Sequence, residues 1–121
     1  DREASDTIAK GIEQPQRLIH LAGERFLSIA DASALIARSR LLVGVDTGMT
    51  HMGIAHQRPT VCVFGSTRPY TETKTPNARI LFEDLHCAPC RKHPTCNGAY
   101  DCMRLVTPET VLRAALEICV P

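Results

Sequence analysis

Two groups of side chains in this sequence have types and spacings that could do chemistry. The first group follows a short apolar run, within six residues: Asp46, Thr47, Gly48, Thr50 and His51. Backbone N–H groups at a helix N-terminus, with hydroxyl and imidazole donors beside them, suit a phosphate, and a glycine lets the backbone approach it closely. The bland alternative is that Asp46 and Thr47 only cap the helix and that His51 is structural. The turn by itself favours neither interpretation.

The second group is a cysteine cluster. Four of the six cysteines fall within sixteen residues: Cys87, Cys90, Cys96 and Cys102. Four thiolates in a compact loop suit a structural zinc or iron ion, with His86 or His93 as a replacement ligand. The alternatives are reduced thiols, or one or two disulfides, that hold the loop on the rest of the domain. A metal enclosed by four cysteines leaves no position for a substrate, so the expected role is structural.

The elements that position these groups alternate between helical patterns and short apolar runs. Helices are expected at residues 1–12, 28–39, 46–57 and 107–118, and strands at 17–22, 41–45, 60–64 and 78–82. This order predicts the α/β class: a Rossmann-like parallel sheet flanked by helices, with a Cys-rich loop. The run at 41–45 is continuously apolar, which predicts a strand in the middle of the sheet, covered on both faces. Because a helix comes first, at least one β-α unit is expected upstream.

Length and charge narrow the class of protein. The 121 residues predict one domain, residues 1–121, truncated at its N-terminal side, with residues 83–104 as a Cys-rich excursion. The net charge is +1 and there is no basic stripe, so nucleic acid is not an expected partner. The apolar runs are strand-sized, so no transmembrane segment is expected.

A second polar loop is expected beside the first. Adjacent parallel strands project their following loops from the same edge of a sheet, which is where ligands bind in open α/β folds. The loop at residues 65–69 should therefore lie next to the turn at 46–51. Thr67 or Arg68 could then touch a phosphate or a sugar, although a solvated loop arginine is the simpler interpretation of Arg68.

The two loops together carry a family resemblance. Asp-Thr-Gly at 46–48, His51, Arg-Pro-Thr at 58–60 and the Gly-Ser-Thr-Arg-Pro loop at 65–69 resemble the ADP-heptose:lipopolysaccharide heptosyltransferases, glycosyltransferase family 9. The resemblance implies the C-terminal, donor-binding half of a two-domain GT-B enzyme that inverts the anomeric centre and requires no cofactor for catalysis. By that likeness Asp46, Thr47, Gly48 and His51 surround the diphosphate and heptose of ADP-heptose, and Glu3 lies near the ribose.

The resemblance also implies what this chain lacks. In the family the general base comes from the N-terminal domain, so this chain alone is expected to bind the donor without catalysing transfer. The acceptor, a lipopolysaccharide core glycan or a protein, would be held through that domain. The implied location is cytoplasmic, with peripheral association at the inner membrane through the full-length enzyme. Many family members carry a similar cysteine-rich stretch, and an iron-bearing version occurs in relatives that heptosylate autotransporter proteins.

Another kind of function remains open at this point. A metal-stapled α/β module could recognise a protein or another nucleotide without transferring a sugar. Such a module requires an ordered cysteine loop and an exposed partner surface, whereas the transferase requires an ADP-sugar at residues 46–51. A redox role for Cys87 and Cys90 is weak, because a Cys-x-x-Cys redox motif normally opens a helix directly after a strand.

Overall fold

The computed structural model describes residues 2–21, 27–69, 75–91 and 93–119, and it divides the chain into two compact units, Asp1–Ala32 and Ser33–Pro121. The elements in chain order are α1 (Arg2–Lys10), the 3-10 helix η1 (Pro15–Arg17), α2 (Ile29–Arg38), β1 (Leu42–Val45), α3 (Gly48–Ala55), β2 (Thr60–Phe64), β3 (Ala78–Phe82), α4 (Asp101–Arg104) and α5 (Pro108–Ile118). The prediction of a single domain over residues 1–121 therefore stays a prediction.

The first unit contains α1, η1 and the start of α2. Ser28 caps α2, because its Oγ accepts a hydrogen bond from the backbone N–H of Asp31 at 3.1 Å. The strand predicted at residues 17–22 is wrong for its described part. Pro15 starts η1 instead, and the residues after Arg17 pair with no strand among the described residues. A strand residue is stabilised by packing against its neighbours, whereas Ile19 is 81% exposed.

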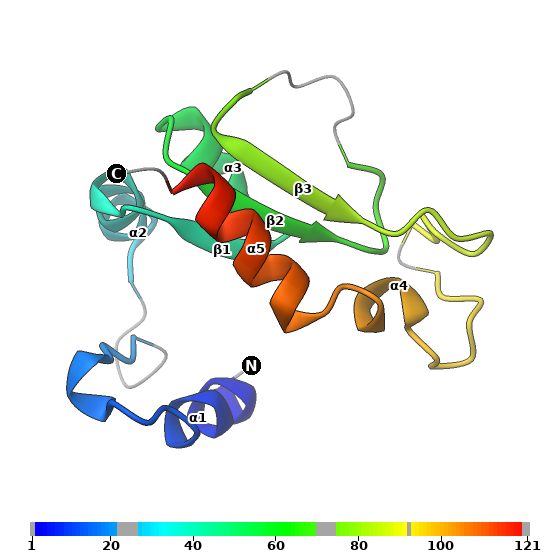
Figure 1. The fold of residues 1–121 in the computed structure, drawn as a ribbon, viewed down its shortest axis with the longest axis horizontal. Coiled ribbons are helices and arrows are strands. Elements are labelled where there is room, and N and C mark those ends of the chain that lie inside the picture. The colour runs from blue at the N-terminus through cyan, green and yellow to red at the C-terminus, as the bar shows by residue number, and fades with distance from the viewer. Residues whose placement is uncertain (1, 22–26, 70–74, 92, 120–121) are drawn as a thin grey trace. The chain divides into compact units, whose positions relative to one another are not determined.

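The second unit is built on a parallel sheet in the order β1-β2-β3, which confirms the predicted α/β, Rossmann-like class (Figure 1). The register pairs Val43 with Val61 and Val61 with Arg79. α5 packs on one face of β2 and β3, where Ala114 and Ala115 lie against Val61, which is 0% exposed. Burial of these aliphatic side chains is the main stabilising contribution.

α3 covers the opposite face of the sheet. A Cβ atom on Gly53 would lie 2.6 Å from both Leu42 Cδ2 and Thr60 Oγ1, so only a glycine lets the helix come this close. Gly44 makes a similar close approach, since a Cβ there would lie 2.8 Å from Thr50 Cγ2. The helix backbone is thereby held directly above the strands whose carboxyl ends carry the polar loops.

β1 departs from its prediction. In the described part of the chain it is an edge strand, and Val43 and Val45 are 49% and 48% exposed. The prediction of a strand covered on both faces is therefore wrong here. The prediction fails because α5 packs on β2 and β3, so the helix does not cover the face of β1 that carries Val43 and Val45. No helix in the described ranges is both long and apolar enough to cross a membrane.

Candidate functional site

The turn between β1 and α3 is shaped by Thr50. Its Oγ lies within donor distance of two carbonyl oxygens, of Val45 at 2.9 Å and of Thr47 at 2.7 Å, and it accepts from the N–H of Thr47 at 3.4 Å. The residue is 2% exposed. A buried hydroxyl with these partners fixes the backbone of the turn. Thr50 was predicted as a possible phosphate donor, and the structure places it under the turn, among backbone groups.

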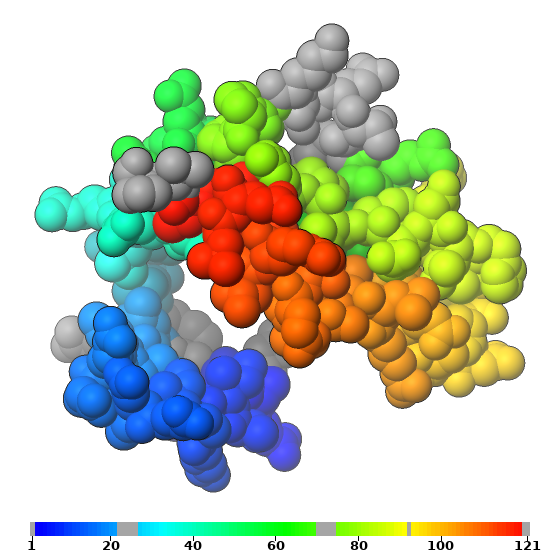
Figure 2. Space-filling view, in the orientation of Figure 1, coloured from blue at the N-terminus to red at the C-terminus, as the bar shows by residue number. Residues whose placement is uncertain are grey.

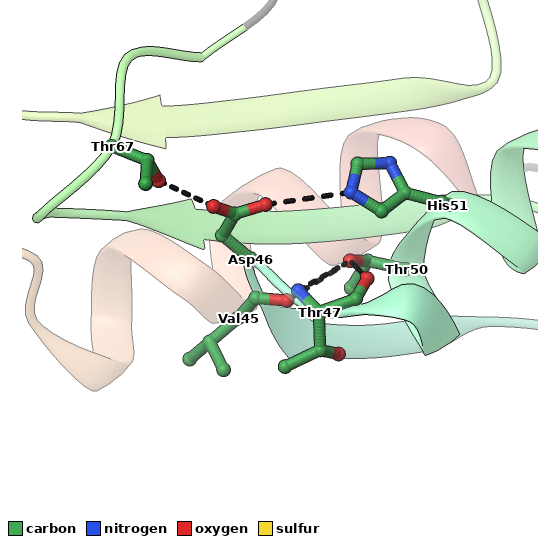
Figure 3. Close-up of polar contacts among 6 residues, drawn as sticks. All are labelled: Val45, Asp46, Thr47, Thr50, His51 and Thr67. Carbon is green, nitrogen blue, oxygen red and sulfur yellow. Dashed lines mark hydrogen bonds and ion pairs between the residues drawn. The ribbon is translucent and has the colours of Figure 1, made fainter. Parts of the chain in front are cut away.

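Three polar side chains meet above that turn (Figure 3). Thr67 Oγ1 donates a hydrogen bond to Asp46 Oδ2, and His51 Nε2 lies 3.4 Å from Asp46 Oδ1. Asp46 therefore uses one carboxylate oxygen for each partner. Thr67 comes from the loop after β2, whereas His51 comes from the first turn of α3. The expected meeting of the two loops at one sheet edge is borne out for these residues.

The start of α3 is open. Thr47 occupies the N-cap with an extended backbone, φ −141° and ψ 167°, and Gly48 begins the helix. A Cβ on Gly48 would meet no atom within 4 Å. The first amides of a helix have no intrahelical acceptor and carry the positive end of its dipole. The geometry thus presents N–H donors beside the Asp46–His51 pair, at the edge where such folds hold ligands.

Glu3 is the one predicted site residue of the first unit. It lies in the first turn of α1, in the other compact unit, and it is exposed. Its backbone carbonyl accepts from the Thr7 hydroxyl at 2.8 Å. A role near a ribose stays a prediction for this residue. Arg68 is exposed in its loop, which agrees with the simpler interpretation.

The cysteine cluster forms a second candidate site. The four clustered cysteines are free thiols, and they line one cavity of about 260 Å³. Neither His86 nor His93 lines it. Within the described ranges, no group of three or more His, Cys, Asp or Glu side chains is arranged around a point where a single ion could sit.

The electrostatics of the four thiols differ. Backbone hydrogen bonds, first from Tyr100 and then from Gly98 and Ala99, lower the pKa of Cys96. Partial burial, followed by the charges of the other three cysteines, raises the pKa of Cys102. The thiols are thus close enough to interact, and one of them is surrounded by donors that favour a thiolate.

Contacts that sequence reasoning missed join the two sites. The backbone N–H of Arg91 donates to the carbonyl of Ser66 at 2.7 Å, and Ser66 also lines the cysteine cavity. The next residue is Thr67, which donates to Asp46. The cavity further includes Asp101, in an α4 helix that was not predicted. The sequence signal for this helix was Asp101 itself, because an acidic residue is favourable at the start of a helix.

A parallel sheet with helices on both faces and a polar helix N-terminus at its carboxyl edge defines a Rossmann-like ligand-binding domain. Comparisons with known proteins identify the family. A family model described as glycosyltransferase family 9 (heptosyltransferase) matches residues 1–101. The chain belongs to this family, whose fold is of the GT-B type.

Individual relatives agree. The chain is 35% identical over 93 residues to lipopolysaccharide heptosyltransferase 1 of Pseudomonas aeruginosa, covering 76% of this chain and 24% of the relative. It is 30% identical over 115 residues to lipopolysaccharide heptosyltransferase 2 of Salmonella typhimurium, and 31% identical over 115 residues to that of Escherichia coli. Each of these two matches covers 93% of this chain and 32% of the relative. The chain therefore spans about a quarter to a third of the length of these relatives. No solved structure matches it.

Proposed function

We propose that the turn between β1 and α3 binds the diphosphate of an ADP-sugar, with heptose as the sugar, and that the full-length protein is an inverting heptosyltransferase. The proposed acceptor is the lipopolysaccharide core or a related glycan or protein. The observation that carries the proposal is the Thr67–Asp46–His51 contact beside the open start of α3. The names of the relatives support the choice of sugar and acceptor. The alternative of a binding module without transferase activity finds no support in them.

The chemistry of the site follows from charge. As the sugar–phosphate bond breaks, negative charge grows on the departing diphosphate, and fixed N–H donors stabilise that charge in the transition state. The amides at the start of α3 and the His51 ring, which Asp46 holds beside them, are the groups that we propose for this role. Asp46 acts as a positioning residue, because its two oxygens hold His51 and Thr67 in one arrangement.

The acceptor hydroxyl still requires a general base. We assign that role to the other domain of the full-length enzyme and expect residues 1–121 alone to bind the donor without transferring sugar. The catalytic step as proposed uses no cofactor. The proposed setting is the cytoplasm, with the enzyme at the inner membrane where its lipid-linked acceptor lies.

The test is equilibrium binding of ADP to the full-length protein by calorimetry, with UDP and GDP as controls. Gly48→Ala adds a methyl group where the protein has no atom within 4 Å, so lost affinity would report a blocked phosphate. His51→Ala removes a donor, and its loss should weaken ADP binding roughly tenfold to a hundredfold if the bonded phosphate is charged.

His56→Ala is the matched control. His56 terminates the same helix and contacts Ser33 Oγ at 2.8 Å, at the end remote from the proposed phosphate. It should leave ADP affinity within about twofold. The proposal fails if His51→Ala and Gly48→Ala remain folded and bind ADP as tightly as His56→Ala does, or if UDP or GDP binds more tightly than ADP.

A further inference from the structure

Two polar side chains are buried among the described residues, and both are threonines, Thr50 and Thr60. A buried hydroxyl is costly unless it forms hydrogen bonds. The Thr60 hydroxyl donates to the carbonyl of Arg58 at 2.8 Å, where β2 begins. The Thr50 hydroxyl is directed instead at the turn that follows β1. The two threonines therefore meet the same chemical need at opposite ends of the parallel strands.

The partners of Thr50 lie on both sides of Asp46 (Figure 3). In the peptide group before Asp46, the carbonyl oxygen of Val45 lies 2.9 Å from the Thr50 hydroxyl. In the peptide group after it, the N–H of Thr47 donates to that hydroxyl at 3.4 Å. Because peptide groups are planar, holding both of them restricts the two backbone dihedral angles of Asp46. The rotamers open to a side chain depend on these angles, so the direction of the Asp46 carboxylate depends on Thr50.

Thr50 is itself held by the sheet below it. Its methyl group lies over Gly44 of β1, where a Cβ atom would be 2.8 Å from Thr50 Cγ2. Cys62 of β2 pairs with Gly44 in the register and is buried. Burial raises the pKa of its thiol, and a hydrogen bond with the Thr50 hydroxyl opposes that shift. The other face of β2 lies under α5, drawn in orange to red in Figure 2, so the strand that supports Thr50 is packed on both sides.

We propose that Thr50 is a positioning residue of the donor site. Its hydroxyl holds the backbone around Asp46, so that the carboxylate keeps the His51 ring and the Thr67 hydroxyl in place before the ligand binds. Thr50 itself contacts no part of the donor. Groups that are already in place need not be reorganised when charge develops on a diphosphate, and this lowers the barrier to transfer. This role rests on the proposed ADP site, and Thr50 acts there only through Asp46.

The first experiment removes the hydroxyl from each buried threonine of the full-length protein. Thr50→Val should weaken ADP binding by roughly tenfold or more, since small misplacements of binding groups have effects of that size. Thr50→Ser keeps the hydroxyl and should bind ADP within about threefold of wild type. Thr60→Val is the matched control, because it makes the same change at an equally buried threonine at the other end of the strands. It should leave ADP affinity within about twofold.

A second experiment displaces Thr50 without changing it. Gly44→Ala places a methyl group 2.8 Å from Thr50 Cγ2, so Thr50 must move, and ADP binding should weaken by roughly tenfold. Thr50→Ser lacks that Cγ2 atom and keeps the hydroxyl. The double variant Gly44→Ala/Thr50→Ser should therefore recover ADP affinity to within about threefold of wild type. This pair keeps the test in force if Thr50→Val does not fold, and a Gly44→Ala protein that binds ADP normally would contradict the role of Thr50.

Amide NMR spectra of the ligand-free proteins separate this role from the proposed function. The His51 and Thr67 signals should shift in Thr50→Val and stay in place in Thr60→Val. Equal weakening of ADP binding in the two valine variants would indicate general destabilisation and would overturn the role of Thr50. So would a folded Thr50→Val that binds ADP normally while His51→Ala binds it weakly, and the ADP site would then stand. If wild type binds no ADP, the proposed function fails, and unshifted His51 and Thr67 signals in Thr50→Val would overturn the positioning as well.

Discussion

Two parts of the second unit are held together in different ways. The sheet body, which we define as residues 41–64, 78–82 and 107–118, has fully buried side chains such as Val61 and Phe64 at its centre. In the cysteine excursion, residues 83–104, Ala88 is the only buried residue among those that the structure describes. In the sheet body, apolar burial specifies the structure, whereas in the excursion the polar backbone and the thiols must do so. We therefore expect the stability of the sheet body and the geometry of the excursion to respond to different substitutions.

The largest expected effect is on the sheet body. Phe64→Ala removes a ring that is 2% exposed and should lower the free energy of unfolding by about 3–5 kcal/mol. Met103→Ala, on a partly exposed side chain of the excursion, should cost less than about 1 kcal/mol. Urea unfolding followed by circular dichroism compares the two. Equal losses would mean that the excursion belongs to the same core as the sheet body.

This division also explains which parts of the fold could be predicted from the sequence. Apolar runs and capping residues are local signals, so the sequence predicts some elements at their observed positions. These are the strands Thr60–Phe64 and Ala78–Phe82 and the N-cap at Thr107. The strand at residues 17–22 failed because an extended run becomes a strand only when a partner strand lies beside it. The edge position of β1 is likewise a property of its neighbours.

The candidate site shows the same limit. The turn at residues 46–51 was recognisable from its donors and its glycine, and the meeting of two loops followed from parallel topology. The contact of Thr67 with Asp46, and the burial of the Thr50 hydroxyl beneath the turn, depend on side-chain directions that spacing does not encode. The cysteines were evident as a cluster, but their shared cavity arises from the turns between them.

A second test of the sheet body compares two glycines of helix α3. Gly53→Ala should destabilise the protein by about 1–3 kcal/mol, since its Cβ would lie 2.6 Å from Thr60 Oγ1 in a fully buried place. Gly48→Ala meets no atom and should change stability by no more than about 1 kcal/mol, towards stabilisation. Thermal unfolding of both variants is the measurement. If Gly53→Ala proves harmless, α3 does not pack as closely as the structure shows.

The third test addresses the excursion. Cys96→Ala should speed amide hydrogen exchange of residues 96–104 by roughly threefold to tenfold, because the backbone N–H groups of Tyr100 and Gly98 lose the sulfur that accepts their hydrogen bonds. The amides of β2 should exchange as before, since their protection comes from the sheet ladder. Mass-spectrometric hydrogen exchange resolves both segments, with Cys119→Ala as the control, because Cys119 follows α5 and lies outside the excursion. Faster exchange throughout β2 would show that the two parts unfold together.

A smaller effect is expected at the start of α5. The Thr107 hydroxyl accepts a hydrogen bond from the N–H of Thr110 at 3.3 Å, so Thr107→Ala should cost about 1 kcal/mol through the lost cap. Thr107→Ser keeps the acceptor and should restore most of that loss. Chemical denaturation measures both. Since α5 covers the buried face of β2, an effect confined to the excursion would contradict this assignment of the helix to the sheet body.

The smallest effect is a pH dependence at the same helix start. Hydrogen bonds from its own backbone N–H and from the Thr107 hydroxyl lower the pKa of Glu109 below its usual value near 4.5. A carboxyl whose pKa is lower in the folded state stabilises the fold above its unfolded pKa, and this contribution disappears as the pH falls through the folded value. The stability difference between wild type and Glu109→Gln should therefore be complete at pH 7 and shrink below about pH 4.5. Urea midpoints measured from pH 7 to pH 3 test it. In a Thr107→Ala background the pH dependence should become weaker, because one of the two donors is gone, whereas an unchanged dependence would assign the whole effect to the helix backbone.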